Sequence, residues 1–526
     1  MASALPAPEQ RNFLRPVEPL LVAEALEKFA APAVGAGKVQ ILRPPAVSTK
    51  NQLSLSLSLP IGPAYLAATL EKAGYEIDLI DAIGEGLQTT QTTDCGRFVR
   101  QGLTRDEIIA RIDPKTRVLG ISLLFSQEWV EQRGLIKAIR RQFPDLVIVA
   151  GGEHVSSLPE YVLRDCPEID YVITNEAEIT FLAFVHHILY GRSVEDIPGV
   201  CFIGPDDDFV TNGPGNRIKD FANLPRPAWN LVKVDEYRHS PHNYGIDVGF
   251  SMPVLATRGC PFQCTFCSSP SMWTTRYLMR DPGEVADEVA DLVKTYKVDG
   301  IIFTDLTALT RKDWILDFCR EIKSRNLFLS WQMPTGTRSE ALDEEVLTAL
   351  YGVGCRLLTY APESGSPETL EQIKKRITLD KMMESIKLAI ALGHQAKVSV
   401  ILGFPHETRK NIFQSLWFIL KLAFIGAHDC YPWIYSPYPG SELYEKLLKQ
   451  GVVPPPSDAY FDSLHGQTDF ANNSDFTKDG VNSSQIPLRE LNFYRTMGGG
   501  LFYLISYTIR PARLFHLVRN ILRPGF

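Results

Sequence analysis

The sequence predicts an α/β protein with an N-terminal Rossmann-like sheet, a partial (β/α)6 barrel and a mainly helical C-terminal region. Short apolar strands alternate with amphipathic helices in two separate series, and a turn-rich stretch divides them. The second series has six strand-like runs, PVLAT, VDGIIFTD, LFLSWQM, CRLLTYAP, AKVSVILGF and DCYPWIYSP, fewer than the eight strands of a closed barrel. Ligands of such parallel sheets bind at the carboxyl ends of the strands.

We expect five segments along the chain. They are an N-terminal extension (1–37), the Rossmann-like domain (38–205), a linker (206–250), the partial barrel (251–450) and the C-terminal helical region (451–526). In the barrel, Asp281 is the expected N-cap of a helix that places Val285, Val289 and Leu292 on one face.

Composition excludes several classes of protein. The chain has 526 residues, of which 45% are hydrophobic and 22% charged, so it is globular in composition and long enough for two or three domains with full cores. Its formal net charge of −7 and acidic pI of about 5.9 give no overall basic footprint of the kind that a nucleic-acid-binding protein needs. The first residues do not resemble a secretory signal, and the nine cysteines show no paired spacing. We therefore expect a cytoplasmic protein that does not bind nucleic acid.

Three cysteines, Cys260, Cys264 and Cys267, lie in the run CPFQCTFC directly after the first strand of the second series. Three thiolates so close together can hold an iron–sulfur cluster and leave one iron open, because four normally close such a site. A structural zinc site is a weaker alternative, since it needs further ligands and only His239 and His242 are near. A redox CxxC pair would leave Cys260 without a role.

This CxxxCxxC run after the first strand of a βα-repeat domain resembles the radical S-adenosylmethionine (SAM) superfamily. The resemblance implies a [4Fe–4S] cluster whose open iron chelates SAM, and a reductant such as flavodoxin or ferredoxin. It also implies SAM contacts from residues at or near strand ends. The residues are Phe266, Asp305, Arg338, Glu363, Ser364 and Gly403, with Glu407 in the same run as Gly403.

Three strand ends of the first half resemble the cobalamin-binding fold. They carry Asp81, Gly86, Ser122, Leu124, Gly151, Gly152 and Glu153. No GxGxxG follows the first strand, which disfavours a dinucleotide. The family pattern DxHxxG has Ile83 in place of its histidine, and isoleucine cannot coordinate cobalt. His154 is a weaker alternative ligand.

Together these features resemble cobalamin-dependent radical SAM enzymes over about residues 38–450, which implies methylation of an unactivated carbon in a small molecule. A lipid-like or other hydrophobic substrate is favoured by aromatic residues near the cysteines and in the last strand, namely Trp273, Tyr277, Tyr431, Trp433, Tyr435 and Tyr438. An oxidative cyclase, or another non-methylating radical reaction, is the first alternative. A corrinoid- or metal-binding protein without SAM turnover is the second. A methylthiotransferase is disfavoured because its second cysteine triad and RNA-binding tail are missing.

The C-terminal run GGGLFYLISYTIRPARLFHLVRNILRPGF is apolar with recurring arginines, Arg510, Arg513, Arg519 and Arg523. Its apolar stretch is too short to span a bilayer, and Pro511 interrupts it. We favour helices buried on the barrel. The alternative is an interfacial helix pair that gives the protein peripheral contact with a membrane.

Overall fold

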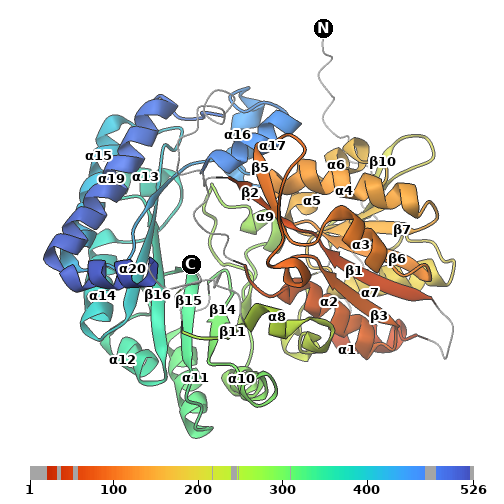
Figure 1. Cartoon of the computed structure of the whole chain (residues 1–526), viewed down its shortest axis with the longest axis horizontal. Helices are drawn as coiled ribbons and strands as arrows, with labels where there is room; N and C mark the ends of the chain where they lie inside the picture. Colours follow the sequence, from red (N-terminus) through yellow and green to blue (C-terminus); the bar gives the residue numbers. More distant parts are fainter. Residues whose placement is uncertain are drawn as a thin grey trace.

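The computed structural model describes residues 21–31, 37–50, 57–215, 217–238, 246, 248–307, 310–467 and 481–521. Figure 1 shows two α/β units side by side, with the last two helices, α19 (Leu488–Ile509) and α20 (Pro511–Ile521), on the outer side of the second unit. His239, His242 and Arg523, named above, lie outside the described residues.

The first unit is a seven-stranded sheet in the order β10-β9-β8-β7-β6-β1-β3. Its strands are β1 (Lys38–Arg43), β3 (Ile77–Asp81), β6 (Thr116–Ser122), β7 (Val147–Gly151), β8 (Tyr171–Ile173), β9 (Val200–Ile203) and β10 (Phe209–Thr211). The first five are parallel, and β9 and β10 are antiparallel additions at one edge. The sheet thus continues into the stretch expected to be the linker.

Helices cover both faces of this sheet, so its central strands β1, β6 and β7 bury side chains on both sides. One face packs against α1 (Val22–Lys28), α2 (Ile61–Lys72) and α7 (Glu178–Leu189). The other packs against α3 (Arg105–Arg111), α4 (Trp129–Gln142), α5 (Glu153–Ser157) and α6 (Pro159–Asp165). A small antiparallel sheet of β2 (Ala46–Thr49), β5 (Phe98–Gln101) and β4 (Thr90–Thr92) lies beside it.

The second unit is a six-stranded parallel sheet in chain order, open between β11 and β18, which confirms the predicted partial barrel. Its strands are β11 (Ser251–Val254), β14 (Gly300–Phe303), β15 (Ser330–Thr337), β16 (Cys355–Glu363), β17 (Gln395–Leu402) and β18 (Pro432–Ile434). The helices between them are α10 (Pro282–Tyr296), α11 (Lys312–Ser324), α12 (Glu344–Gly352), α13 (Pro367–Gln372), α14 (Leu379–Ala391) and α15 (Arg409–Ile425). As predicted, the Asp281 side chain caps α10.

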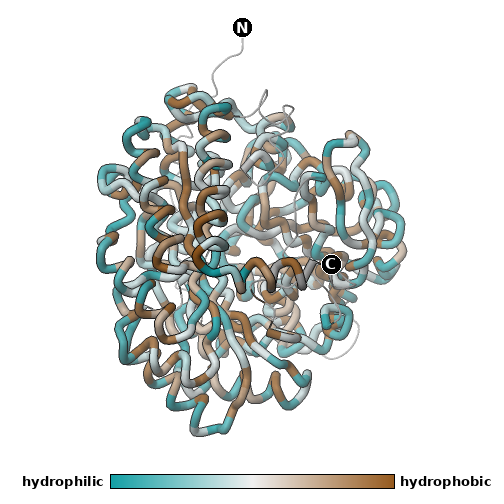
Figure 2. The backbone as a smooth tube through the Cα atoms, turned by 60° about the vertical axis from the view of Figure 1, so that its left-hand side comes forward, coloured by the Kyte–Doolittle hydropathy of each residue, from teal (hydrophilic) through white to brown (hydrophobic). Residues whose placement is uncertain are grey.

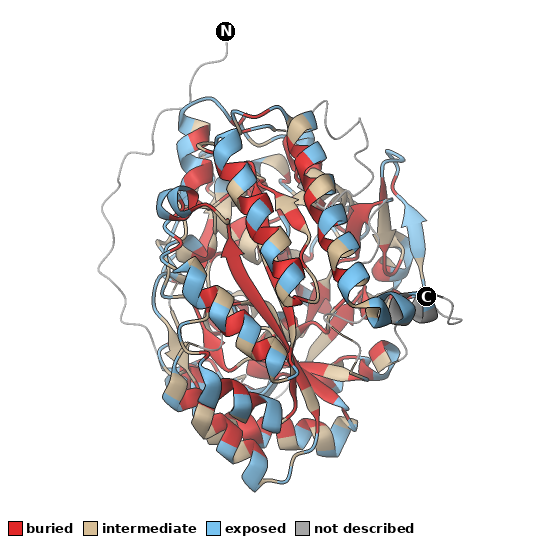
Figure 3. Ribbon diagram, turned by 90° about the vertical axis from the view of Figure 1, so that its left-hand side faces the viewer, coloured by how far each residue is buried: buried red, intermediate tan, exposed pale blue. Residues whose placement is uncertain are grey.

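The C-terminal region is helical, as predicted: α16 (Glu442–Lys449), α17 (Asp458–Ser463), α19 (Leu488–Ile509) and α20 (Pro511–Ile521). Helix α17 returns to the first unit, where Asp458 pairs with Arg133 at 2.7 Å. Helix α19 packs along α15, and Figures 2 and 3 show its apolar and buried positions along this contact. Among the described helices, none is long and apolar enough to cross a membrane.

Candidate active site

The three cysteines lie on the loop between β12 (Thr257–Arg258) and α9 (Ser269–Trp273), just past the carboxyl end of β11. Backbone hydrogen bonds join this loop to two later segments of the chain. Thr265 N donates to Ile373 O at 3.1 Å, and Leu443 N donates to Thr265 O at 2.8 Å. The loop is therefore fixed at the mouth of the partial barrel.

The three thiols are free and partly buried. Burial raises the pKa of Cys260 and Cys264, and that of Cys267 to about 11. Within the described residues, no three His, Cys, Asp or Glu side chains lie close enough to hold one metal ion. His239 and His242, the further ligands of the zinc alternative, lie outside these residues. A cluster binds each thiolate through a different iron, and metal coordination deprotonates a thiol despite burial. This donor set fits a cluster.

Two cations lie beside the cysteine loop. The Arg338 guanidinium is 3.7 Å from the ring centre of Phe262 and also donates to the Arg376 carbonyl. Lys375 is buried, and its ammonium donates to Glu363 Oε1 at 3.0 Å. Both positive charges oppose the effect of burial on the pKa of Cys264. Each cation also has a carboxylate partner, since Arg338 pairs with Glu340 at 2.7 Å and Lys375 with Glu363.

Asp305 is buried and does not face open space. Its carboxylate accepts hydrogen bonds from the amides of Ala256 and Thr257 and, at 2.5 Å, from the Thr257 hydroxyl. Burial raises the pKa of Asp305 to about 6, and these hydrogen bonds limit the rise. The carboxylate thus positions the segment that enters the cysteine loop, whereas the sequence suggested a SAM contact.

An aromatic surface begins between the second and third cysteines. The ring of Phe266 packs 5.7 Å from that of Phe404, which lies 5.0 Å from Tyr435. Phe404 is fully buried and Phe266 partly exposed. Such a surface fits the flat adenine of SAM.

The strand ends behind Phe266 form a buried polar framework. Glu407 Oε2 accepts from Gly403 N at 2.7 Å and from Phe404 N at 3.0 Å. The Ser364 hydroxyl lies 3.0 Å from that of Ser415 and is fully buried. Ser364 and Gly403 are therefore placed behind the surface, where they shape the loops.

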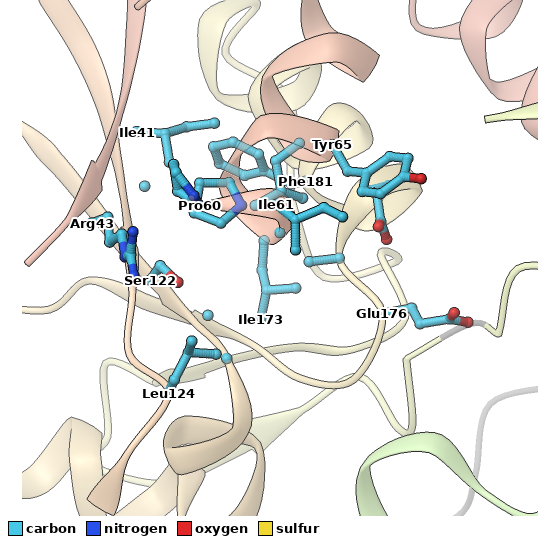
Figure 4. Close-up of a pocket in the computed structure, with 18 of the residues that line it drawn as sticks. Ile41, Arg43, Pro60, Ile61, Tyr65, Ser122, Leu124, Ile173, Glu176 and Phe181 are labelled. Atoms are coloured by element: carbon cyan, nitrogen blue, oxygen red, sulfur yellow. The ribbon is translucent and has the colours of Figure 1, made fainter. Parts of the chain in front are cut away.

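A cavity of about 390 Å³ lies between the two units and is lined by residues of both; we call it the interdomain cavity. Figure 4 shows it between strand ends of the first sheet and α2, with mostly apolar side chains around it. Four predicted cobalamin contacts line it: Ser122, Leu124, Gly151 and Gly152. From the second unit it is lined by Leu255, Thr257, Arg258, Gly259, Met272, Trp273, Thr304 and Leu306. Gly259 directly precedes Cys260, so the cavity extends to the cysteine loop.

The part of this lining on β6 and β7 is small and flat. Ser122 pairs with Gly151 across the two strands. A Cβ at Gly151 would meet only the Ile173 carbonyl, at 3.7 Å, and Gly152 has φ +120°, with Leu123 O only 2.3 Å from an added Cβ. Small residues at the ends of neighbouring parallel strands fit the flat corrin of cobalamin.

The DAIGEG loop, in which we expected Asp81 and Gly86 to contact cobalamin, does not line the cavity. Asp81 is buried, pairs with Arg43 at 3.4 Å and accepts from the Tyr237 hydroxyl at 2.5 Å. Gly86 packs so closely that an added Cβ would lie 2.3 Å from Leu103 N. Asp81 and Gly86 thus fold the loop, while Arg43, which the sequence did not single out, lines the cavity.

Glu153 and His154 also lie outside the cavity lining. The Glu153 carboxylate accepts from the Ser268 hydroxyl, next to Cys267, and burial raises its pKa. His154 is buried, its Nδ1 lies 2.9 Å from the Ser126 hydroxyl, and burial lowers its pKa to about 3. None of the described lining residues is a histidine.

Arg258 joins the two units across the cavity wall. It is buried and forms ion pairs with Glu178 and, at 3.4 Å, with Glu176 of the first unit. Its guanidinium also lies 4.6 Å from the ring centre of Phe221. Sequence reasoning missed Arg258, Arg43 and Lys375, since no local pattern distinguishes a buried cation from a solvated one.

Comparison with known proteins agrees with this geometry. The B12-binding domain family model matches residues 55–185, and the radical SAM superfamily model matches residues 254–418. The radical SAM methyltransferase TsrM from Kitasatospora setae has the same fold, with TM-score 0.61 and 19% identity over 80% of this chain and 79% of that one.

Three curated relatives cover most of this chain. An uncharacterized methyltransferase of Pyrococcus horikoshii is 29% identical over 79% of this chain and 84% of its own length. The cytidylyl-2-hydroxyethylphosphonate methyltransferase of Streptomyces wedmorensis is 29% identical over 80% of this chain and 84% of its length. The anaerobic magnesium-protoporphyrin IX monomethyl ester cyclase of Rubrivivax gelatinosus is 27% identical over 74% of this chain and 66% of its length.

The radical SAM domain implies a [4Fe–4S] cluster and SAM, and the B12-binding domain implies cobalamin. With both domains present in this order, the chain is a cobalamin-dependent radical SAM enzyme.

Proposed function

We propose that this enzyme transfers a methyl group to an unactivated carbon of a small hydrophobic substrate. One observation carries the proposal. The interdomain cavity is lined both by the Ser122, Gly151 and Gly152 strand ends and by Gly259 beside the first cysteine. A substrate in this apolar space would contact both halves of the protein. The two most similar relatives reported above are named as methyltransferases, which supports this reaction.

In this proposal, Cys260, Cys264 and Cys267 hold the cluster, and Ser122, Leu124, Gly151 and Gly152 contact the corrin. When bound, the cluster with SAM supplies a carbon-centred radical, and cobalamin supplies the methyl group. The described cavity lining would offer no histidine to cobalt, because Ile83 stands in the DAIGEG loop and His154 is buried outside the lining.

The chain's own side chains bind and orient SAM. Phe266 offers its ring to the adenine, as the aromatic surface with Phe404 suggests. Arg338 and Lys375 provide positive charge for the SAM carboxylate, and Glu363 orients Lys375 through their 3.0 Å hydrogen bond. Asp305, Ser364 and Gly403 act indirectly: their hydrogen bonds hold the cysteine loop and the strand-end loops behind Phe266 in place.

Exclusion of water is the second task of the cavity. Its apolar wall includes Leu124, Leu306 and Met272. A dry cavity protects a reactive carbon radical from unwanted reactions while it is positioned for transfer. The same apolar wall is the reason to favour a hydrophobic substrate.

The test is anaerobic reconstitution with cluster and cobalamin, SAM carrying a labelled methyl group, and flavodoxin or ferredoxin as electron donor. The proposal expects 5′-deoxyadenosine and a product heavier by one methylene, both lost in Cys264→Ala. A corrinoid carrier without SAM turnover would form no 5′-deoxyadenosine. Metabolites that accumulate in a Cys264→Ala strain, compared with its parent, provide the substrate.

An oxidative cyclase is the second candidate, because a cyclase is among the relatives that match most of this chain. Both reactions begin with SAM cleavage, so 5′-deoxyadenosine does not separate them. A product that loses hydrogen without gaining a methylene would favour the cyclase.

A further inference from the structure

Exposed apolar side chains are concentrated on α15, α19 and α20, which we call the outer helical face. Of the seventeen large hydrophobic side chains exposed in the described residues, ten lie on these three helices. They are Phe413, Trp417, Phe424, Phe493, Leu501, Leu504, Ile509, Leu514, Phe515 and Val518. Figure 3 looks onto this side, and Figure 2 shows the apolar residues along α19 and α20. Exposure of this extent at one place marks an interaction surface.

The three helices form one rigid surface. Near the N-terminal ends of the two helices, the Tyr494 ring of α19 packs 5.5 Å from the Phe413 ring of α15, which joins them. At the other end, Arg510 donates to Phe424 O at 2.9 Å, and Arg513 donates to Gly426 O at 2.8 Å. These bonds satisfy carbonyls at the end of α15 and fix α20 across it. The inner side of α19 is thus buried on the barrel as expected, while its outer side remains exposed.

The charge of this surface is opposite to that of the whole protein. The chain has a formal net charge of −7, yet residues 408–428 contain three basic side chains and no acidic one. After Glu490, which pairs with Arg409, no aspartate or glutamate follows up to residue 526. Arg495 is buried, so the exposed positive charge of the described residues comes from Lys410 and Lys421, with the partly exposed Arg510 and Arg513. The Lys421 ammonium lies 5.9 Å from the Trp417 ring centre, so charge and apolar area are adjacent.

We infer that the outer helical face binds the surface of an anionic phospholipid bilayer. Aromatic side chains next to lysine and arginine are suited to the headgroup region, where rings enter the boundary and cations meet lipid phosphates. The helices lie on the bilayer, since none of those described can cross it. A symmetric dimer through this face would instead place the same unbalanced cations against each other. The inference goes beyond methyl transfer and does not depend on it.

Sedimentation with lipid vesicles tests this inference on the full-length protein without SAM. We expect binding to vesicles of phosphatidylcholine and phosphatidylglycerol, little binding to phosphatidylcholine alone, and weakening with salt. Lys421→Glu changes two charge units and should lower the affinity about thirty-fold. The double variant Trp417→Ala and Phe515→Ala should lower it at least about ten-fold, because both side chains are exposed apolar area.

Matched controls come from α11 and the loop after it. Phe328 is 94% exposed and Lys323 is also exposed, so Phe328→Ala and Lys323→Glu should bind like wild type. The inference is overturned if wild type does not bind the anionic vesicles, or if the controls lose as much affinity as the face variants. It is also overturned if light scattering shows a dimer that the Trp417 and Phe515 changes dissociate while vesicle binding stays the same.

Discussion

Arg258 offers the sharpest test of how the two units are joined. Its guanidinium is buried between Glu176 and Glu178 of the first unit and the ring of Phe221. The change Arg258→Met keeps a long apolar side chain but removes the charge. Both carboxylates then stay buried at the wall of the interdomain cavity without this partner.

The expected magnitude follows from burial. Removing one partner of a buried ion pair costs about 3–5 kcal/mol, because the remaining charge stays desolvated. Glu176 remains paired with Arg217 at 3.1 Å, so we expect a loss of unfolding free energy at the lower end of this range. The matched control is Arg226→Met, whose pair with Asp291 has side chains 39% and 63% exposed and is worth at most about 1 kcal/mol.

The defect should depend on pH in a defined direction. Burial raises the pKa of Glu176, and Arg258 is the main charge that opposes the rise. Without Arg258 this pKa rises further above its unfolded value. A carboxyl with a raised folded pKa adds stability only in its protonated form, and this stability is lost as the pH rises through the folded pKa. The loss in Arg258→Met should therefore be larger at pH 8 than at pH 5.

Urea denaturation followed by tryptophan fluorescence measures this difference. We expect an earlier transition for Arg258→Met than for wild type, and a transition close to wild type for Arg226→Met. Equal effects of the two substitutions, or a smaller defect at pH 8 than at pH 5, would refute the reasoning.

Three further predictions concern the cysteine loop and the C-terminal helices. Cys264→Ala should abolish the cluster's visible absorbance after reconstitution, while Cys319→Ala, a thiol in the core, should keep it; equal absorbance in both would contradict the assignment. Asp305→Ala removes the acceptor of two backbone amides, so the free energy of unfolding should fall by about 1–3 kcal/mol in thermal denaturation. The iron content after reconstitution should also fall; unchanged stability and iron content would show that other contacts fix the loop. Gly500→Ala, with no atom within 4 Å, should stabilise by about 1 kcal/mol. At Gly498 the added Cβ would lie 2.7 Å from a Leu416 methyl, and displacing Leu416 should offset this gain; equal stabilisation of both variants in urea denaturation would be inconsistent with this packing.

Much of the fold could be predicted because its signals are local. Each of the six barrel strands was visible as an apolar run, and the helix after Asp281 as a 3.6-residue periodicity. The cysteine spacing could be recognised for the same reason, since its three members lie within eight residues. Ser122, Gly151 and Gly152 line the cavity because strand order alone brings their strand ends to one edge.

The side chains that depend on distant partners could not be predicted in this way. Asp81 looked like a cofactor contact, but its partner Tyr237 is 156 residues away in the sequence. Asp305 likewise binds Thr257, 48 residues earlier. Lys375 lies in the run KKR, which is typical of a solvated surface, and only the folded chain buries it beside Glu363.

Transfer of a labelled methyl group tests the central claim most directly. The reconstituted enzyme is given SAM labelled in its methyl group together with the metabolite that accumulates in the Cys264→Ala strain. The account predicts a labelled product heavier by one methylene, formed only with both cobalamin and an intact cysteine loop. SAM cleavage that continues at full rate without any labelled methyl in the product would contradict it.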